Sequence, residues 1–161
     1  MGNILFQSDY GLGNGTSELS GICLRVDPAL QIYTLSHDLP RLDVAAAAAH
    51  LAAVEPLWPA GTVLVSLVDP AVGTEHRICA ARTVHGCYIL TADNGALAPL
   101  KTSIDRVRDI GPLLKRYPFP AASALLHGKD LAWAAALLAS GQRSFEELGE
   151  PYPAEEIAGT V

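Results

Sequence analysis

The residues with the most chemistry to offer follow the apolar stretches of the chain. One such stretch, residues 62–68, has the β-branched and leucine composition of a strand buried on both faces, and Asp69-Pro70 ends it. Acidic and imidazole side chains stand beside other apolar stretches: Asp9, His37, Asp93 and His127. Carboxylates and imidazoles can orient water, accept hydrogen bonds from hydroxyl groups or bind metal ions. If the strands run parallel, Asp9, His37 and Asp69 gather at one edge of the sheet, where open α/β sheets bind ligands.

Three kinds of site are compatible with these residues. A metal-dependent hydrolase would use them as ligands, but no HxH, HxxxH or DxD spacing places two of them on one strand or turn. A nucleophilic hydrolase would need a serine or cysteine elbow, and the chain has no GxSxG motif. In a nucleoside-type site, a carboxylate accepts hydrogen bonds from both ribose hydroxyls, and glycine turns let the backbone approach the ligand. The residue pattern favours this third kind.

The elements that must hold these side chains are predicted from apolar patterns and their boundaries. Strand patterns occupy residues 4–7, 31–36, 62–68, 78–83, 88–91 and 106–110. Helix patterns run from Thr16 or Ser17 to about Val26 and from Asp43 as N-cap to Val54. Asp130 is expected in the first turn of a helix that ends near Ser140, and Ser144 opens a short last helix. His85-Gly86 predicts a hairpin turn. The alternation predicts an α/β layered domain with a mostly parallel central sheet flanked by helices.

Composition limits the partners and the location of the protein. A length of 161 residues suits one domain with a sizeable core, and a net charge of −6 without a basic run argues against nucleic acid as partner. No apolar run reaches the ~20 residues that span a bilayer. The three cysteines show no CxxC spacing, which predicts reduced thiols, a cytoplasmic protein and no metal site. His50 is expected on the surface of the alanine-rich helix.

Five short motifs occur in order along nearly the whole chain: SDYG at residues 8–11, LSHDLP at 35–40, VDPAVGT at 68–74, DNG at 93–95 and HGKD at 127–130. They resemble the successive motifs of the S-adenosylmethionine hydroxide adenosyltransferases. These enzymes are also called adenosine-forming S-adenosylmethionine hydrolases and are relatives of the fluorinases and chlorinases. The pairing of VDPAVGT with a downstream HGKD is the most specific part of the resemblance.

The resemblance implies a fold, an assembly and a reaction. Residues 1–150 would form the α/β amino-terminal domain of the family, and residues 151–161 would be a linker into a smaller β-barrel domain that is absent from this chain. A homotrimer with sites between neighbouring subunits is implied as well. The implied reaction is attack of water or hydroxide on the ribose C5′ of S-adenosylmethionine, which releases adenosine and methionine without a cofactor.

The resemblance also implies roles for single residues. Asp9 would match the residue that grips the ribose diol, and Asp69 and His127 would match two members of the family's Asp-Arg-His set. Halogenating members of the family carry another residue at the position of Asp69, so the aspartate indicates the branch that uses water. Further residues are expected to contact the substrate: His37, Asp93 and Asn94.

The sequence departs from the family pattern at the arginine. The pattern places an arginine seven residues after the aspartate, but His76 stands there and Arg77 follows it. Because neighbours on a strand face opposite sides, either His76 substitutes for the arginine or Arg77 reaches round to the site. The altered pair and the absent second domain leave another hypothesis open, in which the chain is a non-catalytic module that binds adenosine or S-adenosylmethionine.

Overall fold

The computed structural model describes residues 2–11, 16–71, 76–119 and 128–159. Its strands are β1 (Asn3–Gln7), β2 (Gln31–Ser36), β3 (Val63–Ser66), β4 (Ile78–Thr83), β5 (Tyr88–Ala92), β6 (Ile104–Asp109) and β7 (Glu150–Tyr152). Its α-helices are α1 (Thr16–Val26), α2 (Val44–Val54), α3 (Gly111–Leu114) and α4 (Gly128–Ala139). Short 3₁₀ helices are η1 (Glu55–Leu57), η2 (Ala98–Ser103), η3 (Phe145–Leu148) and η4 (Ala154–Glu156). Within these described ranges, no helix has both the length and the apolar character that crossing a membrane requires.

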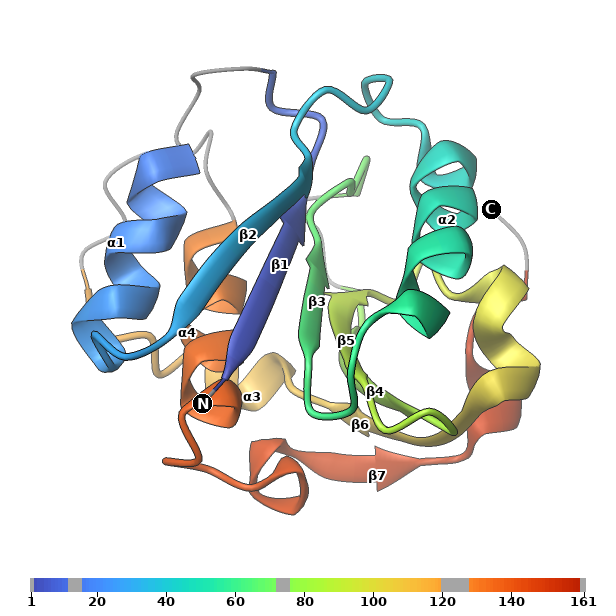
Figure 1. Ribbon diagram of the computed structural model, residues 1–161. Coiled ribbons are helices and arrows are strands. Elements are labelled where there is room, and N and C mark those ends of the chain that lie inside the picture. Colours follow the sequence, from blue (N-terminus) through green and yellow to red (C-terminus); the bar gives the residue numbers. More distant parts are fainter. Residues whose placement is uncertain (1, 12–15, 72–75, 120–127, 160–161) are drawn as a thin grey trace.

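The described strands form one seven-stranded sheet in the order β2-β1-β3-β5-β4-β6-β7 (Figure 1). β2, β1, β3 and β5 run parallel, whereas β4, β6 and β7 are joined by antiparallel pairings. The predicted α/β fold with flanking helices is confirmed, and four of the seven strands, which lie side by side in the sheet, are parallel. The predicted hairpin turn is also present, and Gly86 has the positive φ of 86° that suits the turn between β4 and β5.

Apolar side chains cover both faces of the sheet, because successive residues of a strand point to opposite sides. In β3, Val63 and Val65 join the core beneath α1 and α4, while Leu64 joins the core beneath α2. Figure 1 shows α1 and α4 on one side of the sheet and α2 on the other. The continuous apolar run of this strand therefore follows from its burial on both faces.

Helix α2 begins where the sequence predicts. Asp43 is its N-cap, and the Asp43 Oδ1 atom accepts a hydrogen bond from the Ala46 N–H at 3.0 Å. The prediction for His50 needs a correction, because this residue is half-buried and its Nδ1 lies 2.7 Å from Oε1 of Gln7 in β1. Gln7 is fully buried, so His50 provides a hydrogen-bond partner for a polar group of the core.

Strand β3 is shorter than predicted. Its pairing ends at Ser66, so Asp69 stands three residues beyond the strand and not at its end. Leu67 and Val68 are nevertheless buried. The apolar run therefore correctly predicts which residues are buried. The strand predicted from it, residues 62–68, is longer than the strand in the structure.

The last part of the chain packs onto the same sheet. The predicted capping box of Ser144 and Glu147 is present, and the helix that it opens is the 3₁₀ helix η3. β7 lies across the boundary predicted at residue 150 and pairs with β6. The division into two domains stays a prediction.

Candidate active site

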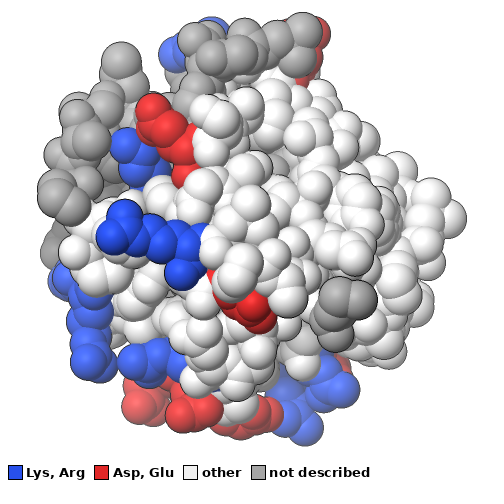
Figure 2. Space-filling model, turned by 60° about the vertical axis from the view of Figure 1, so that its left-hand side comes forward, with Lys and Arg blue, Asp and Glu red and all other residues white. Residues whose placement is uncertain are grey.

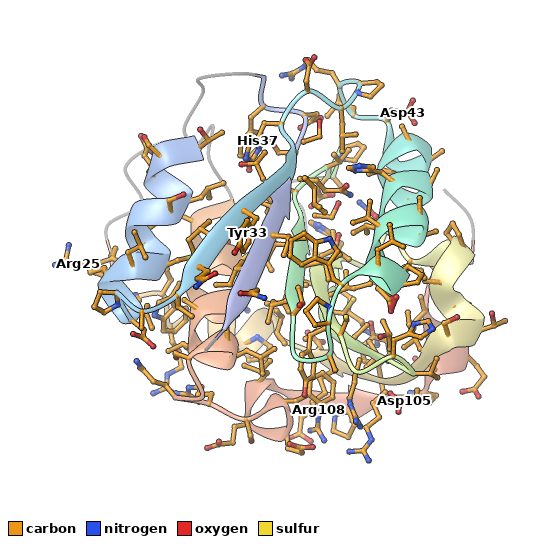
Figure 3. The ribbon with its side chains drawn as sticks, in the orientation of Figure 1. Arg25, Tyr33, His37, Asp43, Asp105 and Arg108 are labelled. Carbon is orange, nitrogen blue, oxygen red and sulfur yellow. The ribbon has the colours of Figure 1, made fainter. Side chains whose placement is uncertain are left out.

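The loops that follow β1, β2, β3 and β5 lie at one edge of the sheet, because these four strands are parallel. It is the upper edge in Figure 1. These loops carry five of the predicted site residues: Asp9, His37, Asp69, Asp93 and Asn94. Figure 3 shows His37 at the end of β2. The shared edge follows from strand direction, whereas the role of each side chain depends on its partners.

Asp69 is paired with His76. One carboxylate oxygen, Oδ2, lies 2.5 Å from His76 Nε2, and the other accepts a hydrogen bond from the Ala71 N–H at 3.1 Å. The Asp69 and His76 side chains are 13% and 20% exposed, so solvent or a ligand can still reach the pair. The backbone N–H and the imidazole together fix the orientation of the carboxylate.

Arg77 points away from this pair. Its guanidinium lies 3.9 Å from the centre of the Tyr152 ring, and its Nη1 lies 3.4 Å from Glu156 Oε1. Its Nε is 4.0 Å from Asp109 Oδ2. The described contacts of Arg77 are therefore with β6, β7 and η4, and His76 occupies the side that faces Asp69.

Asp9 and His37 make contacts within the loops of the candidate site. Asp9 is 8% exposed, and its Oδ2 accepts a hydrogen bond from the Leu42 N–H at 2.6 Å. Leu42 has a φ of 58°, a strained conformation for leucine that this contact helps to hold. His37 Nδ1 lies 2.6 Å from Ser8 Oγ, and burial lowers the pKa of His37 below its usual value.

Asp93 has both carboxylate oxygens in hydrogen bonds with the last part of the chain. Oδ2 accepts from the Tyr152 hydroxyl at 2.8 Å, and Oδ1 accepts from the Ala158 N–H at 2.9 Å. Its neighbour Asn94 donates from Nδ2 to the Val68 carbonyl at 3.2 Å. These contacts give Asp93 and Asn94 structural roles, and their predicted contact with substrate stays a prediction.

Tyr10 is a residue of the site that the sequence reasoning missed. Burial and, after it, the Asp9 charge raise the pKa of Tyr10, a hydrogen bond from the Gly128 backbone lowers it, and the net result is a pKa of about 12. The charges of Asp130 and Asp69 add to the rise. The hydroxyl therefore lies within the field of three carboxylates and stays protonated at neutral pH. The available signal was its position inside the SDYG motif.

His127 lies outside the described residues. Gly128, which follows it in the sequence, begins α4 and lies against Tyr10 and Leu67. A Cβ atom at Gly128 would come within 2.8 Å of the Tyr10 hydroxyl oxygen and 2.7 Å of Leu67 Cδ1, so a glycine is needed there. In the part of the chain that the structure describes, no three His, Cys, Asp or Glu side chains form a group that could hold a metal ion.

Comparison with known proteins places the chain in a family. The family model described as "SAM hydroxide adenosyltransferase N-terminal domain" matches residues 4–149. A Salinispora tropica protein named (R)-S-adenosyl-L-methionine hydrolase is 36% identical over 141 residues, which cover 86% of this chain and 53% of that protein. A Thermus thermophilus protein of the same name is 32% identical over 165 residues, which cover 96% of this chain and 63% of that protein.

A solved structure has a similar fold. The crystal structure of an uncharacterized conserved protein from Thermotoga maritima has a TM-score of 0.84 and 25% sequence identity, over 93% of this chain and 58% of that one. The chain spans about half the length of the Salinispora relative. Because the family model matches residues 4–149, which is most of the chain, the chain belongs to the SAM hydroxide adenosyltransferase N-terminal domain family.

Proposed function

We propose that this chain supplies the ribose and water side of an S-adenosylmethionine hydrolase, in which water or hydroxide attacks the ribose C5′ and releases adenosine and L-methionine. The observation that carries the proposal is the Asp69–His76 pair, 2.5 Å apart within and just after the VDPAVGT motif. The relatives that bear the name (R)-S-adenosyl-L-methionine hydrolase support the choice of substrate.

The proposed hydrolysis depends on a correctly positioned water molecule and does not require a general acid. The sulfonium leaves as a neutral thioether, so no proton has to be given to the leaving group. Free water has a pKa of ~15.7 and is a poor nucleophile. Asp69 orients the water and accepts its proton as the attack develops, while His76 holds the carboxylate in place. His127 is proposed as a second partner of the water.

Asp9 is proposed to bind the ribose hydroxyls. One of its oxygens already accepts a hydrogen bond from the Leu42 N–H. An ionised carboxylate has about four acceptor positions, so the diol can be bound while this contact is kept. His37, beside Asp9 on the next loop, would line the same part of the site.

A second candidate function is favoured by the direction of Arg77. The Arg77 guanidinium contacts Tyr152 and Glu156, so the position beside Asp69 is occupied by the His76 imidazole in place of the arginine that the family pattern predicts. On this reading the chain binds adenosine or S-adenosylmethionine and does not hydrolyse it.

Assembly and location are part of the proposal. The homotrimer is proposed from the family resemblance. A cytoplasmic location is proposed because Cys23, Cys79 and Cys87 are all free thiols.

The deciding experiment is incubation of the chain with S-adenosylmethionine and quantification of adenosine and methionine by mass spectrometry. We expect the two products in equal amounts, above a protein-free blank and above an Asp69→Asn variant. Calorimetric titration with adenosine is run on the same samples. Adenosine binding without product formation would replace the hydrolase by the binding module, and the absence of both would reject the two functions for this chain.

A further inference from the structure

The loop that follows β5, residues 93–97, contacts the backbone segment that presents Asp69. The Asn94 side chain in this loop donates from Nδ2 to the Val68 carbonyl at 3.2 Å. Val68 directly precedes Asp69 and is 1% exposed. Because the pairing of β3 ends at Ser66, the Val68 carbonyl lies beyond the ladder, and the Asn94 amide supplies it with a donor. The backbone immediately before Asp69 is therefore held by a side chain from another loop.

The same loop contacts the segment that presents His76. The backbone N–H of Asp93 donates to the Arg77 carbonyl at 2.9 Å, and Arg77 directly follows His76. The next residue, Ile78, pairs with Ala92 in the ladder between β4 and β5. Since this contact involves the main chain of Arg77, it holds the backbone after His76 whichever way the guanidinium points. The loop after β5 is thus bonded on both sides of the carboxylate–imidazole pair.

The Asn94 side chain has a fixed orientation. Its Oδ1 accepts a hydrogen bond from the Ala96 N–H at 3.2 Å, a local contact by which asparagine commonly stabilises a turn. Because Oδ1 is bonded to Ala96, Nδ2 is the amide atom that faces the Val68 carbonyl. Ala96 and Val68 also belong to one buried apolar cluster, together with Val44 and Ala47 of α2. Packing and hydrogen bonding therefore join the two loops at the same point.

Ion pairs are a less firm attachment for this part of the chain. The Arg77 side chain is 38% exposed, and its partners Glu156 and Asp109 are 54% and 40% exposed. Figure 2 shows Lys, Arg, Asp and Glu side chains gathered at the surface along the lower border of the molecule. Pairs between exposed charges contribute little to stability and weaken with salt. The hydrogen bonds of the loop after β5 join neutral groups, and Val68 is buried, so they hold the segment more firmly.

We propose that Asn94 is a positioning residue of the candidate active site, which acts through Val68 and sets the position of the Asp69 carboxylate relative to His76. The Asp69 Oδ2 and His76 Nε2 atoms are 2.5 Å apart, so a small displacement of either backbone segment changes the geometry of the pair. Misplacement of a reacting group by about 1 Å can lower a rate on the order of 10²-fold. The expected effect on turnover rests on the proposed function, whereas the expected effect on the pair does not.

The first test is a spectroscopic measurement on the pair. An ionised carboxylate can only accept hydrogen bonds, so the proton between the two side chains is on His76 Nε2. The exchange of this N–H proton with water is measured by NMR on isotope-labelled protein, and its signal is assigned by its loss in His76→Ala. Asn94→Asp keeps an acceptor oxygen for the Ala96 N–H and removes the donor to Val68. It should accelerate the exchange about fivefold, as expected for the loss of one neutral hydrogen bond.

Two further variants separate this contact from other effects of the substitution. Asn94→Ser removes the same donor without adding a charge, and the same acceleration is expected. The matched control is Asn3→Asp, which makes the identical chemical change at the start of β1, at the opposite edge of the sheet, and should leave the exchange rate unchanged. Circular dichroism establishes that each variant is folded.

Turnover of S-adenosylmethionine gives the second measurement. In the folded Asn94 variants, kcat should fall about 10-fold or more while KM stays within about twofold, because the pair is misplaced and the ribose side is not. Unchanged exchange of the His76 N–H in both variants would overturn the proposal, and so would the absence of a protected His76 N–H in the unmodified chain. If exchange accelerates in the variants but no chain forms product, the proposed function fails and the positioning role stands.

Discussion

Asp69 and Asp93 each follow a parallel strand at the same edge of the sheet, yet their surroundings differ. Asp69 accepts hydrogen bonds from its own loop and from His76, and the pair remains partly open to solvent. Asp93 has both oxygens in hydrogen bonds with Tyr152 and Ala158, which are 59 and 65 residues further along the chain. Asp69, whose partners are local, stays open to solvent or a ligand, whereas Asp93 is held in a structural role by a distant segment of the chain.

The largest expected effect is that of Asp69→Asn. The amide cannot accept a proton from water, so product formation should fall on the order of 10²- to 10⁴-fold while the far-ultraviolet circular dichroism stays unchanged. Product release is measured by mass spectrometry with S-adenosylmethionine as substrate. The matched control is Asp93→Asn, which should retain product formation in the folded fraction. Equal losses of product formation in the two variants would contradict the assignment of a catalytic role to Asp69 and a structural role to Asp93.

The next effect concerns the histidine that stands where the family pattern has arginine. His76→Ala should lower turnover about 10²-fold, because the Asp69 carboxylate loses the group that orients it. His76→Arg should retain most of the activity, because the guanidinium can donate hydrogen bonds to the Asp69 carboxylate and is itself always positively charged. Arg77→Ala is the control on the neighbouring position, and its turnover should be close to that of the unmodified chain. If Arg77→Ala lowered turnover as much as His76→Ala, the assignment of His76 as the partner of Asp69, with Arg77 directed away from it, would be wrong.

A smaller effect, on stability, is expected at Asp93. Tyr152→Phe removes the hydroxyl that donates to Asp93 and should lower the free energy of unfolding by about 1–2 kcal/mol, measured by urea denaturation. Tyr33→Phe is the matched control, because its hydroxyl bonds to Gln31 on an exposed strand edge. That change should stay within about 0.5 kcal/mol of zero. Comparable losses of unfolding free energy in both variants would mean that the Tyr152–Asp93 hydrogen bond stabilises the fold no more than an exposed one does.

The smallest effect is a pH dependence that originates at His37. Burial lowers the pKa of His37 in the folded protein, whereas the unfolded chain takes up the proton near the ordinary value of about 6.5. The contribution of neutral His37 to stability is therefore complete above about pH 6.5 and is lost as the pH falls toward the lowered folded value. Unfolding free energies measured on both sides of this pH should fall more steeply for the unmodified chain than for His37→Gln. Identical slopes would remove His37 as the source.

Much of the fold could be predicted because it depends on short stretches. The cap at Asp43, the hairpin at Gly86 and the two-face burial of β3 follow from neighbouring residues and from strand periodicity. The end of β3 could not be predicted, because Leu67 and Val68 are buried without belonging to the strand. A hydrophobic pattern reports burial and carries no information on where ladder pairing stops.

The candidate site could also be predicted only in part from the sequence. The sequence motifs predicted Asp69 and Asp9 as site residues, and they left His76 and Arg77 as the two alternatives for one position. The choice between these two depends on Tyr152, Glu156 and Asp109, which attract the Arg77 guanidinium from distant parts of the chain. No local pattern contains that information, because it arises when β6, β7 and η4 are packed beside β4.

The sequence by itself determined the kinds of residue at the strand ends, the order of the motifs and the alternation of strands and helices. Tertiary structure decided which carboxylates are occupied by other parts of the chain and which member of the His76-Arg77 pair meets Asp69. The physical reason is that the hydrogen bonds and the exposure of a side chain depend on every group that packs against it, including groups from distant parts of the chain. Asp93 illustrates this, because its two oxygens are filled by residues that the chain supplies more than fifty positions later.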